Sequence, residues 1–78
     1  MANNVDANDP TKYKRLAASL RRQIQDGTIA VGGQVTITQL AAENRWSRQT
    51  CARALGILES EGLVARYDGL GYYVTGIP

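Results

Sequence analysis

A short polar run, Ser47-Arg48-Gln49-Thr50, combines side chains that contact nucleic acids readily. An arginine guanidinium can bridge O6 and N7 of a guanine, and a glutamine amide can pair with the N6/N7 edge of an adenine. Ser47 and Thr50 can donate hydroxyl protons to phosphate oxygens, and the amides at a helix N-terminus also favour phosphate. The run therefore predicts a contact with double-stranded DNA if it lies at the exposed start of a helix.

Basic residues gather around this run and in one other part of the chain. No acidic residue stands between Glu43 and Glu59, and that stretch contains Arg45, Arg48 and Arg53. A second basic stretch, between Asp9 and Asp26, contains Lys12, Lys14, Arg15, Arg21 and Arg22. The formal net charge is only +2, but two such segments predict one positive face for a polyanion.

These basic residues have different expected roles. Arg48 is the candidate for reading a base, most often guanine. Arg45 and Arg53 are candidate DNA contacts, and each is equally well explained as a solvated charge. The basic residues between positions 12 and 22 favour a solvated helix face, although Lys14 or Arg15 can add attraction to the DNA backbone that does not depend on base sequence.

The residue inventory argues against an enzyme. The chain has no histidine, one cysteine and seven acidic residues, so the usual groups for metal ligation, acid–base catalysis and covalent catalysis are nearly absent. We therefore expect no catalytic residue, no metal and no cofactor. Cys51 falls on an apolar helical stripe and is expected to be an inert core thiol, not a redox sensor.

Length and targeting signals bound the class of protein. With 78 residues, one compact domain is the limit. A single cysteine cannot form an internal disulfide, which suits a reducing cytosol. The sequence shows neither a signal peptide nor an apolar run of about 18 residues, so we expect a cytoplasmic protein with no membrane contact.

Three helices are predicted to position the polar run. Residues 11–26 carry apolar side chains at helical spacing, preceded by an Asp9-Pro10 cap and stopped by Gly27. Residues 37–44 form a short helix that begins with a capping box between Thr36 and Gln39. After a tight turn, Ser47 caps a third helix whose inward positions are Cys51, Ala54, Leu55 and Leu58. Residues 1–8 are polar without a period and are predicted to be a disordered arm.

A hairpin follows the third helix. Gly62 is typical of a Schellman end, and residues 63–67 and 72–75 are strand-like runs joined by two turn glycines, Gly69 and Gly71. A very short strand is also expected around Val35. The side chains of Arg66, Tyr67 and Tyr72 either lie along phosphates or fill the hairpin faces.

The order of elements predicts a mainly α fold with a small β-hairpin, namely a winged helix-turn-helix domain over residues 9–76. In this motif the second of two short helices enters the major groove by its N-terminal end. The candidate DNA-contact residues are therefore Thr36, Arg45, Ser47, Arg48, Gln49, Thr50, Arg53, Arg66, Gly69 and Tyr72.

From about Tyr13 to Val74 the chain resembles the DNA-binding domain of the GntR family of bacterial transcription regulators. The resemblance rests on the Tyr13, Leu16, Leu20 and Ile24 series, Gly27, and the runs Leu40-Ala41-Ala42-Glu43 and Ser47-Arg48-Gln49-Thr50. It continues through Ala54-Leu55, Leu58-Glu59-Ser60-Glu61-Gly62-Leu63-Val64 and Gly69-Leu70-Gly71-Tyr72-Tyr73-Val74. The last two runs are the most specific.

The resemblance implies a winged helix that binds operator DNA, usually as a homodimer on a palindrome, for transcriptional control that is most often repression. It implies DNA contacts at Ser47, Arg48 and Thr50, with Gly69 at the wing tip. This chain lacks the arginine that the family carries just before the Leu-Ala of the second helix. The family's second recognition arginine aligns with Ala52, whereas here Arg53 lies one residue later, about 100° round the helix.

Two other functions are compatible with this fold. One is a protein-interaction module that uses Trp46, Ile57 and Leu70 as an apolar docking surface. For Trp46 the sequence favours packing beneath the turn between the second and third helices over base stacking. The other is an accessory DNA-architecture factor, such as an excision or partition protein. A binding affinity that falls steeply as the salt concentration rises would distinguish DNA binding from apolar docking.

Overall fold

The computed structural model describes residues 10–76, so the predicted arm at residues 1–8 and the Asp9 cap lie outside the described residues. The described part contains the helices α1 (Pro10–Gln25), α2 (Ile37–Asn44) and α3 (Arg48–Ser60). It also contains the strands β1 (Gln34–Val35), β2 (Val64–Tyr67) and β3 (Gly71–Val74). This is the predicted winged helix-turn-helix, with α2 as expected and α1 displaced by one residue at each end.

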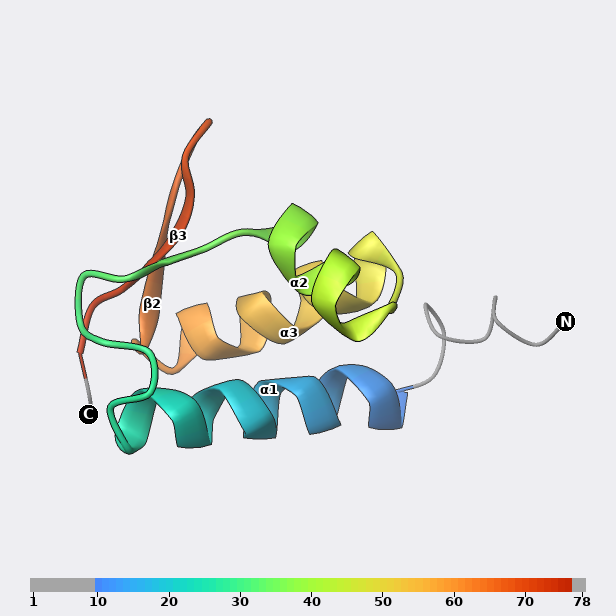
Figure 1. Ribbon diagram of the computed structural model, residues 1–78, viewed down its shortest axis with the longest axis horizontal. Coiled ribbons are helices and arrows are strands. Elements are labelled where there is room, and N and C mark those ends of the chain that lie inside the picture. The colour runs from blue at the N-terminus through green and yellow to red at the C-terminus, as the bar shows by residue number, and fades with distance from the viewer. Residues whose placement is uncertain (1–9, 77–78) are drawn as a thin grey trace, which may run out of the picture.

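Helix α3 is the centre of the domain. Its inward residues Cys51, Ala54, Leu55 and Leu58 are fully buried, as their helical spacing predicted. In Figure 1, α1 lies beneath α3, while α2 and the hairpin of β2 and β3 rise on the opposite side. The apolar stripe of α1 (Leu16, Leu20 and Ile24) completes the core from below.

The helices begin and end at the residues whose local chemistry favours a cap. Thr36 Oγ1 accepts a hydrogen bond from the Gln39 amide at 3.0 Å, so half of the predicted capping box is confirmed. The other half is wrong, because the Gln39 side-chain amide donates to the Glu43 carboxylate one turn later, at 3.5 Å. At the other end of the α2–α3 unit, Gly62 adopts a φ of +81°.

The end of α3 has the hydrogen bonds of a Schellman motif. The Leu63 amide donates to the Leu58 carbonyl at 3.0 Å, and the Gly62 amide donates to the Glu59 carbonyl at 3.0 Å. These bonds satisfy two carbonyls that the helix leaves without partners. The chain therefore turns at a fixed point from α3 into the first strand of the hairpin.

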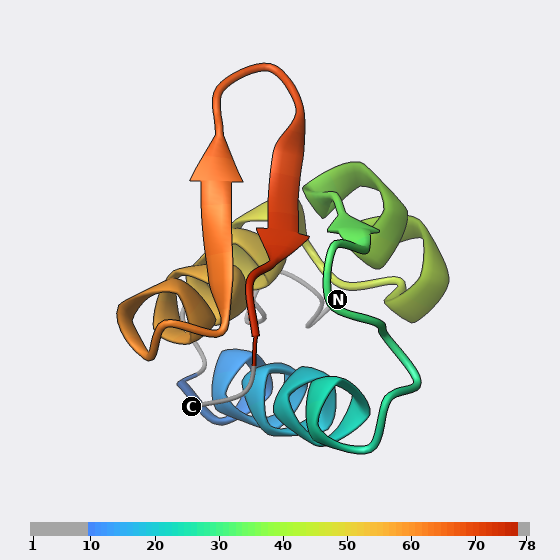
Figure 2. The ribbon, with the colours of Figure 1, turned by 90° about the vertical axis from the view of Figure 1, so that its left-hand side faces the viewer.

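The strands form an antiparallel sheet in the order β1-β3-β2. The Leu70 amide closes the hairpin turn by donating to the Tyr67 carbonyl at 2.9 Å. Gly71 combines a φ of +97° with close packing, since a Cβ at this position would lie 3.1 Å from Thr36 Cγ2. The hairpin thus projects away from α1 and passes close to the start of α2 (Figure 2).

No helix within residues 10–76 combines the length and the apolar character that a bilayer span requires.

Candidate nucleic-acid interface

Ser47 fixes the start of α3. Its hydroxyl oxygen accepts from the Thr50 amide at 3.1 Å, and its extended backbone is that of an N-cap. The cap leaves Arg48 and Gln49 exposed in the first turn. The structure thus brings these two predicted contact residues to the surface at the N-terminal end of the helix.

Thr50 is not part of this exposed surface. Its exposed fraction is 0%, and its Oγ1 accepts a hydrogen bond from the Ser47 hydroxyl at 2.9 Å. The structure therefore does not present the Thr50 hydroxyl at the surface, and its contact with phosphate stays a prediction. Thr50 precedes Ala54 by one turn and points inward with it, and the bond to Ser47 satisfies its hydroxyl in the core.

Arg48 makes one side-chain contact across the helix-turn-helix. Its Nη1 donates to Thr38 Oγ1 of α2 at 2.9 Å. Within residues 10–76, no carboxylate forms an ion pair with Arg48. Because a hydroxyl is neutral, the guanidinium keeps its full positive charge at the surface.

A shallow groove runs from Arg48 to the wing. Its volume is about 400 Å³. It is lined by Thr36, Thr38, Arg48, Gly69, Gly71 and Tyr72 among others. Four of the predicted contact residues, Thr36, Arg48, Gly69 and Tyr72, therefore meet along one surface, although they lie far apart in the sequence.

The wing residues separate into an inner and an outer set. Tyr72 is only 6% exposed and belongs to the core. In this structure its side chain therefore fills the inner face of the hairpin. Arg66 is exposed and pairs loosely with Asp68, with Nη2 and Oδ1 3.4 Å apart. Tyr67 packs edge-on against Tyr73, with ring centroids 5.5 Å apart.

Arg53 and Lys12 lie where α1 approaches the first turns of α3. The Arg53 guanidinium lies 5.4 Å from the centroid of Tyr13, and Lys12 Nζ lies 5.9 Å from the ring centroid of Trp46. Trp46 is half-buried and packs against the core, as its preferred interpretation predicted. Arg53 therefore faces α1, away from the groove at Arg48.

Arg45 occupies the tight turn between α2 and α3. It is the α2 C-cap, with a φ of +56° in the left-handed region, and its side chain is exposed. A non-glycine residue in this region is uncommon and indicates a constrained turn. The turn holds the guanidinium of Arg45 at the surface, close in sequence to the N-cap Ser47.

At the opposite end of α3, a guanidinium is engaged by a carboxylate. Arg21 donates to both oxygens of Glu61, from Nε at 2.9 Å and from Nη2 at 2.7 Å. These hydrogen bonds raise the pKa of Arg21 and lower the pKa of Glu61. The pair fixes α1 to the end of α3 and leaves little net charge there.

The single cysteine is in the interior of the helix-turn-helix. Cys51 is fully buried, and burial raises the pKa of its thiol, while the nearby charge of Arg48 acts in the opposite direction. A buried thiol with a raised pKa is a poor nucleophile. Among residues 10–76 no three histidine, cysteine or acidic side chains gather as a metal site would require.

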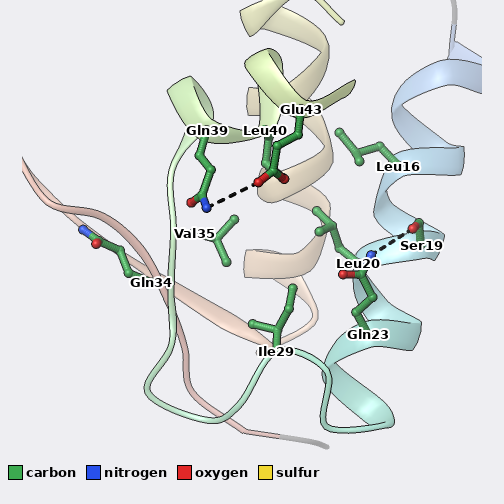
Figure 3. Close-up of a pocket in the computed structure, with 10 residues that line it drawn as sticks. All are labelled: Leu16, Ser19, Leu20, Gln23, Ile29, Gln34, Val35, Gln39, Leu40 and Glu43. Atoms are coloured by element: carbon green, nitrogen blue, oxygen red, sulfur yellow. Dashed lines mark hydrogen bonds between the residues drawn. The ribbon is translucent and has the colours of Figure 1, made fainter. Parts of the chain in front are cut away.

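A second cavity lies between α1, α2 and β1, and Gln34 lines both this cavity and the groove. It has a volume of about 280 Å³. Leu16, Leu20, Val35 and Leu40 form its apolar wall, and the hydrogen-bonded pairs Gln39–Glu43 and Ser19–Gln23 stand at its edge (Figure 3). None of the predicted DNA-contact residues lines it.

Two features of the surface were not predicted from the sequence. One is Thr38 as the partner of Arg48, for which no local signal exists because the two residues lie ten positions apart. The other is the exposure of the large apolar side chains of Val31 and Tyr67. Of the docking surface predicted at Trp46, Ile57 and Leu70, the first two residues are partly buried against the core, and Leu70 is 55% exposed.

Residues 12–74 match the model of the family described as bacterial regulatory proteins, gntR family. No protein with a curated description matches the sequence. Among solved structures, the chain is similar to a GntR family transcriptional regulator from Listeria monocytogenes, with 26% identity and a TM-score of 0.76 over 81% of this chain and 56% of that one. It is also similar to a GntR protein from Rhodococcus sp. RHA1, with 32% identity and a TM-score of 0.80 over 83% of this chain and 31% of that one.

A third similar structure is the DNA-binding domain of AraR in complex with the operator ORX1. It shares 29% identity with this chain at a TM-score of 0.77, over 82% of this chain and 78% of that domain. The chain thus spans about half the Listeria regulator, a third of the Rhodococcus protein and most of an isolated DNA-binding domain.

Proposed function

Because this chain belongs to the gntR family of bacterial regulatory proteins, we propose that it binds double-stranded DNA sequence-specifically and thereby regulates transcription. The N-terminal end of α3 enters the major groove, and the hairpin lies beside it as a wing. Arg48 bridges the N7 and O6 atoms of a guanine, and Gln49 contacts the neighbouring base pair. Binding involves no catalytic step.

The exposed guanidinium of Arg48 at the N-terminus of α3 carries this proposal. It lies in the first turn of the helix, has a neutral hydroxyl as its partner and borders a groove that reaches the wing. The remaining N–H donors of Arg48 can therefore donate to a DNA phosphate or to the edge of a base. The likeness to an AraR DNA-binding domain crystallised with its operator supports DNA as the ligand.

The remaining candidate residues act on the DNA backbone in this proposal. Arg45, in the turn before α3, and Arg66, on β2, are exposed and contribute charge attraction to phosphate. Arg53 contributes at longer range from its place beside Tyr13. Ser47 acts by positioning the first turn, because its hydroxyl is already bonded to Thr50.

We propose further that the protein works as a repressor in the cytoplasm, and that two copies bind the two halves of a palindromic site. In solution without DNA the chain is a monomer or a weak dimer, since its apolar stripes are used in its own core. If this arrangement is correct, DNA sequences selected by the protein should be palindromic, and each should bind two copies of the chain.

Selection of bound duplexes from a random DNA pool tests the proposed function. We expect enrichment of one sequence, and a dissociation constant for it that rises steeply with salt concentration. The control is a duplex of the same composition in scrambled order, which should bind more weakly at every salt concentration. Failure to enrich any sequence, together with affinity that does not depend on salt, would contradict DNA binding as the function.

A further inference from the structure

We infer that Thr38 is a specificity-determining residue that acts by positioning Arg48. The inference rests on the proposed DNA-binding function and deepens it. The hydrogen bond from Arg48 Nη1 to Thr38 Oγ1, at 2.9 Å, is the only side-chain bond of Arg48 within residues 10–76. Thr38 lies on α2 and Arg48 on α3, so the bond crosses the two helices of the helix-turn-helix.

A free arginine side chain samples many rotamers, and fixing it on a base edge costs conformational entropy. A bond formed before binding removes part of that cost. It uses only one of the five N–H donors of the guanidinium, which leaves donors for a two-point contact with guanine. The Thr38 hydroxyl thus restrains Arg48 while leaving four of its five N–H donors for DNA.

The choice of a hydroxyl as the partner matters electrostatically. A carboxylate at position 38 would neutralise Arg48, as Glu61 does for Arg21 at the other end of α3. It would also repel DNA phosphates. Threonine orients the guanidinium and preserves its positive charge, which is the combination that base recognition requires.

The position of Thr38 is itself fixed by the wing. The Gln34 side-chain amide donates to the carbonyl of Leu70 at the hairpin turn. Gly71 packs against Thr36, the residue that caps α2. The chain just before α2 is therefore held against the hairpin at Gln34 and Thr36, and Thr38 presents its hydroxyl to Arg48 from the helical turn that follows.

The test compares Thr38→Val, which removes the hydroxyl and keeps the shape, with Thr38→Ser, which keeps the hydroxyl. Affinities are measured on the selected duplex, on its single-base variants and on random duplex at several salt concentrations. We expect Thr38→Val to reduce discrimination about 3- to 10-fold, the size of one lost hydrogen bond, and only at the base pair that Arg48→Ala also relaxes. Thr38→Ser should restore wild-type discrimination.

Three further measurements make the outcome decisive. Thr38→Val should leave the affinity for random duplex and the salt slope at wild-type values, and adding it to Arg48→Ala should cause no additional loss. Thr38→Ala provides a second variant without the hydroxyl, and thermal unfolding checks that each variant is folded. The positioning role would be overturned if Thr38→Val weakened binding to all duplexes equally. It would also be overturned if discrimination were unchanged in both Thr38→Val and Thr38→Ala. A wild-type protein with no sequence preference would instead refute the proposed function.

Discussion

An arginine lies at the surface beside each end of α3, but the partners of the two arginines differ. At the N-terminal end, Arg48 is bonded to the neutral hydroxyl of Thr38. At the C-terminal end, Arg21 of α1 is bonded twice to the carboxylate of Glu61. The partner therefore decides the role of the arginine. A carboxylate makes a structural pair with little net charge, whereas a hydroxyl leaves a charged group available to a ligand.

The backbone at the two ends differs in the same way. The N-terminal end leaves Arg48 and Gln49 exposed beyond a serine cap. The C-terminal end is closed by the Schellman bonds of Gly62 and Leu63. Substitutions of the exposed side chains Arg48 and Gln49 should change DNA binding without changing stability, and substitutions at the C-terminal end should do the reverse.

The largest effect is expected for Arg48→Ala. It should weaken binding to the selected site by about 1–3 kcal/mol, with relaxed preference at one base pair, because the two-point contact with guanine is lost. Lys14→Ala on the exposed face of α1 is the matched control. It should weaken binding to all duplexes alike and reduce the salt slope by about one unit. Equal losses for Arg48→Ala on specific and random DNA would make Arg48 a phosphate contact only.

At the C-terminal end, Gly62→Ala should reduce the free energy of unfolding by about 1–2 kcal/mol, because an L side chain is strained in the left-handed region. Gly62 has a φ of +81° and open space around its Cα, so backbone strain alone is tested. Denaturant unfolding measures the loss. Affinity for DNA should stay at the wild-type value under conditions where the variant is folded, and a specific loss of affinity would break the separation between the two ends.

Gly56→Ala, in the middle of α3, should raise the free energy of unfolding by about 0.5–1 kcal/mol. Alanine has the higher helix propensity, and a Cβ at position 56 would meet no atom within 4 Å. Close approach of a neighbouring element is therefore not the reason for this glycine, and nothing in the structure explains it. The same unfolding measurement serves here, and a loss of stability would show that α3 has less space than the structure shows.

The smallest effect is expected at the Arg21–Glu61 pair. The hydrogen bonds from Arg21 hold the pKa of Glu61 below its ordinary value of 4.5, so the carboxylate stabilises the fold above that pH. This contribution is lost as the pH falls through the lowered pKa. Glu61→Gln should remove at most about 1 kcal/mol at neutral pH, because the pair is exposed. The unfolding free energies of wild type and variant should converge in acid. A difference that stays constant at all pH values would show that the charge of Glu61 is not its source, and no difference at any pH would show that the pair contributes nothing.

Local signals in the sequence were sufficient for the helices and their ends. Thr36, Ser47, Gly27 and Gly62 each act through neighbours within a few positions, so caps and stops follow from residue type and spacing. The helical and strand periodicity also predicts that Thr50 and Tyr72 are buried, although their polar groups suggested contacts with DNA. Thr50 stands one turn before Ala54, and Tyr72 stands two positions before Val74, so both point inward with these buried partners.

The parts of the interface that could not be predicted depend on contacts between separate elements. The bond between Arg48 and Thr38 requires the crossing of α2 and α3, and the contact between Arg53 and Tyr13 requires the packing of α1 on α3. No spacing rule along the chain specifies either one. The sequence indicated which residues could contact DNA, but only the fold distinguishes Arg48 in the groove from Arg53 beside an aromatic ring.

The most direct test of the account replaces guanine by 7-deazaguanine, one position at a time, in the selected duplex. This base pairs normally but lacks the N7 acceptor that faces the major groove. We predict that one replacement weakens wild-type binding and has no effect on Arg48→Ala, because only wild type uses that acceptor. If the same replacement weakened both proteins equally, or if no replacement affected wild type, Arg48 would not read a guanine from the N-terminal end of α3.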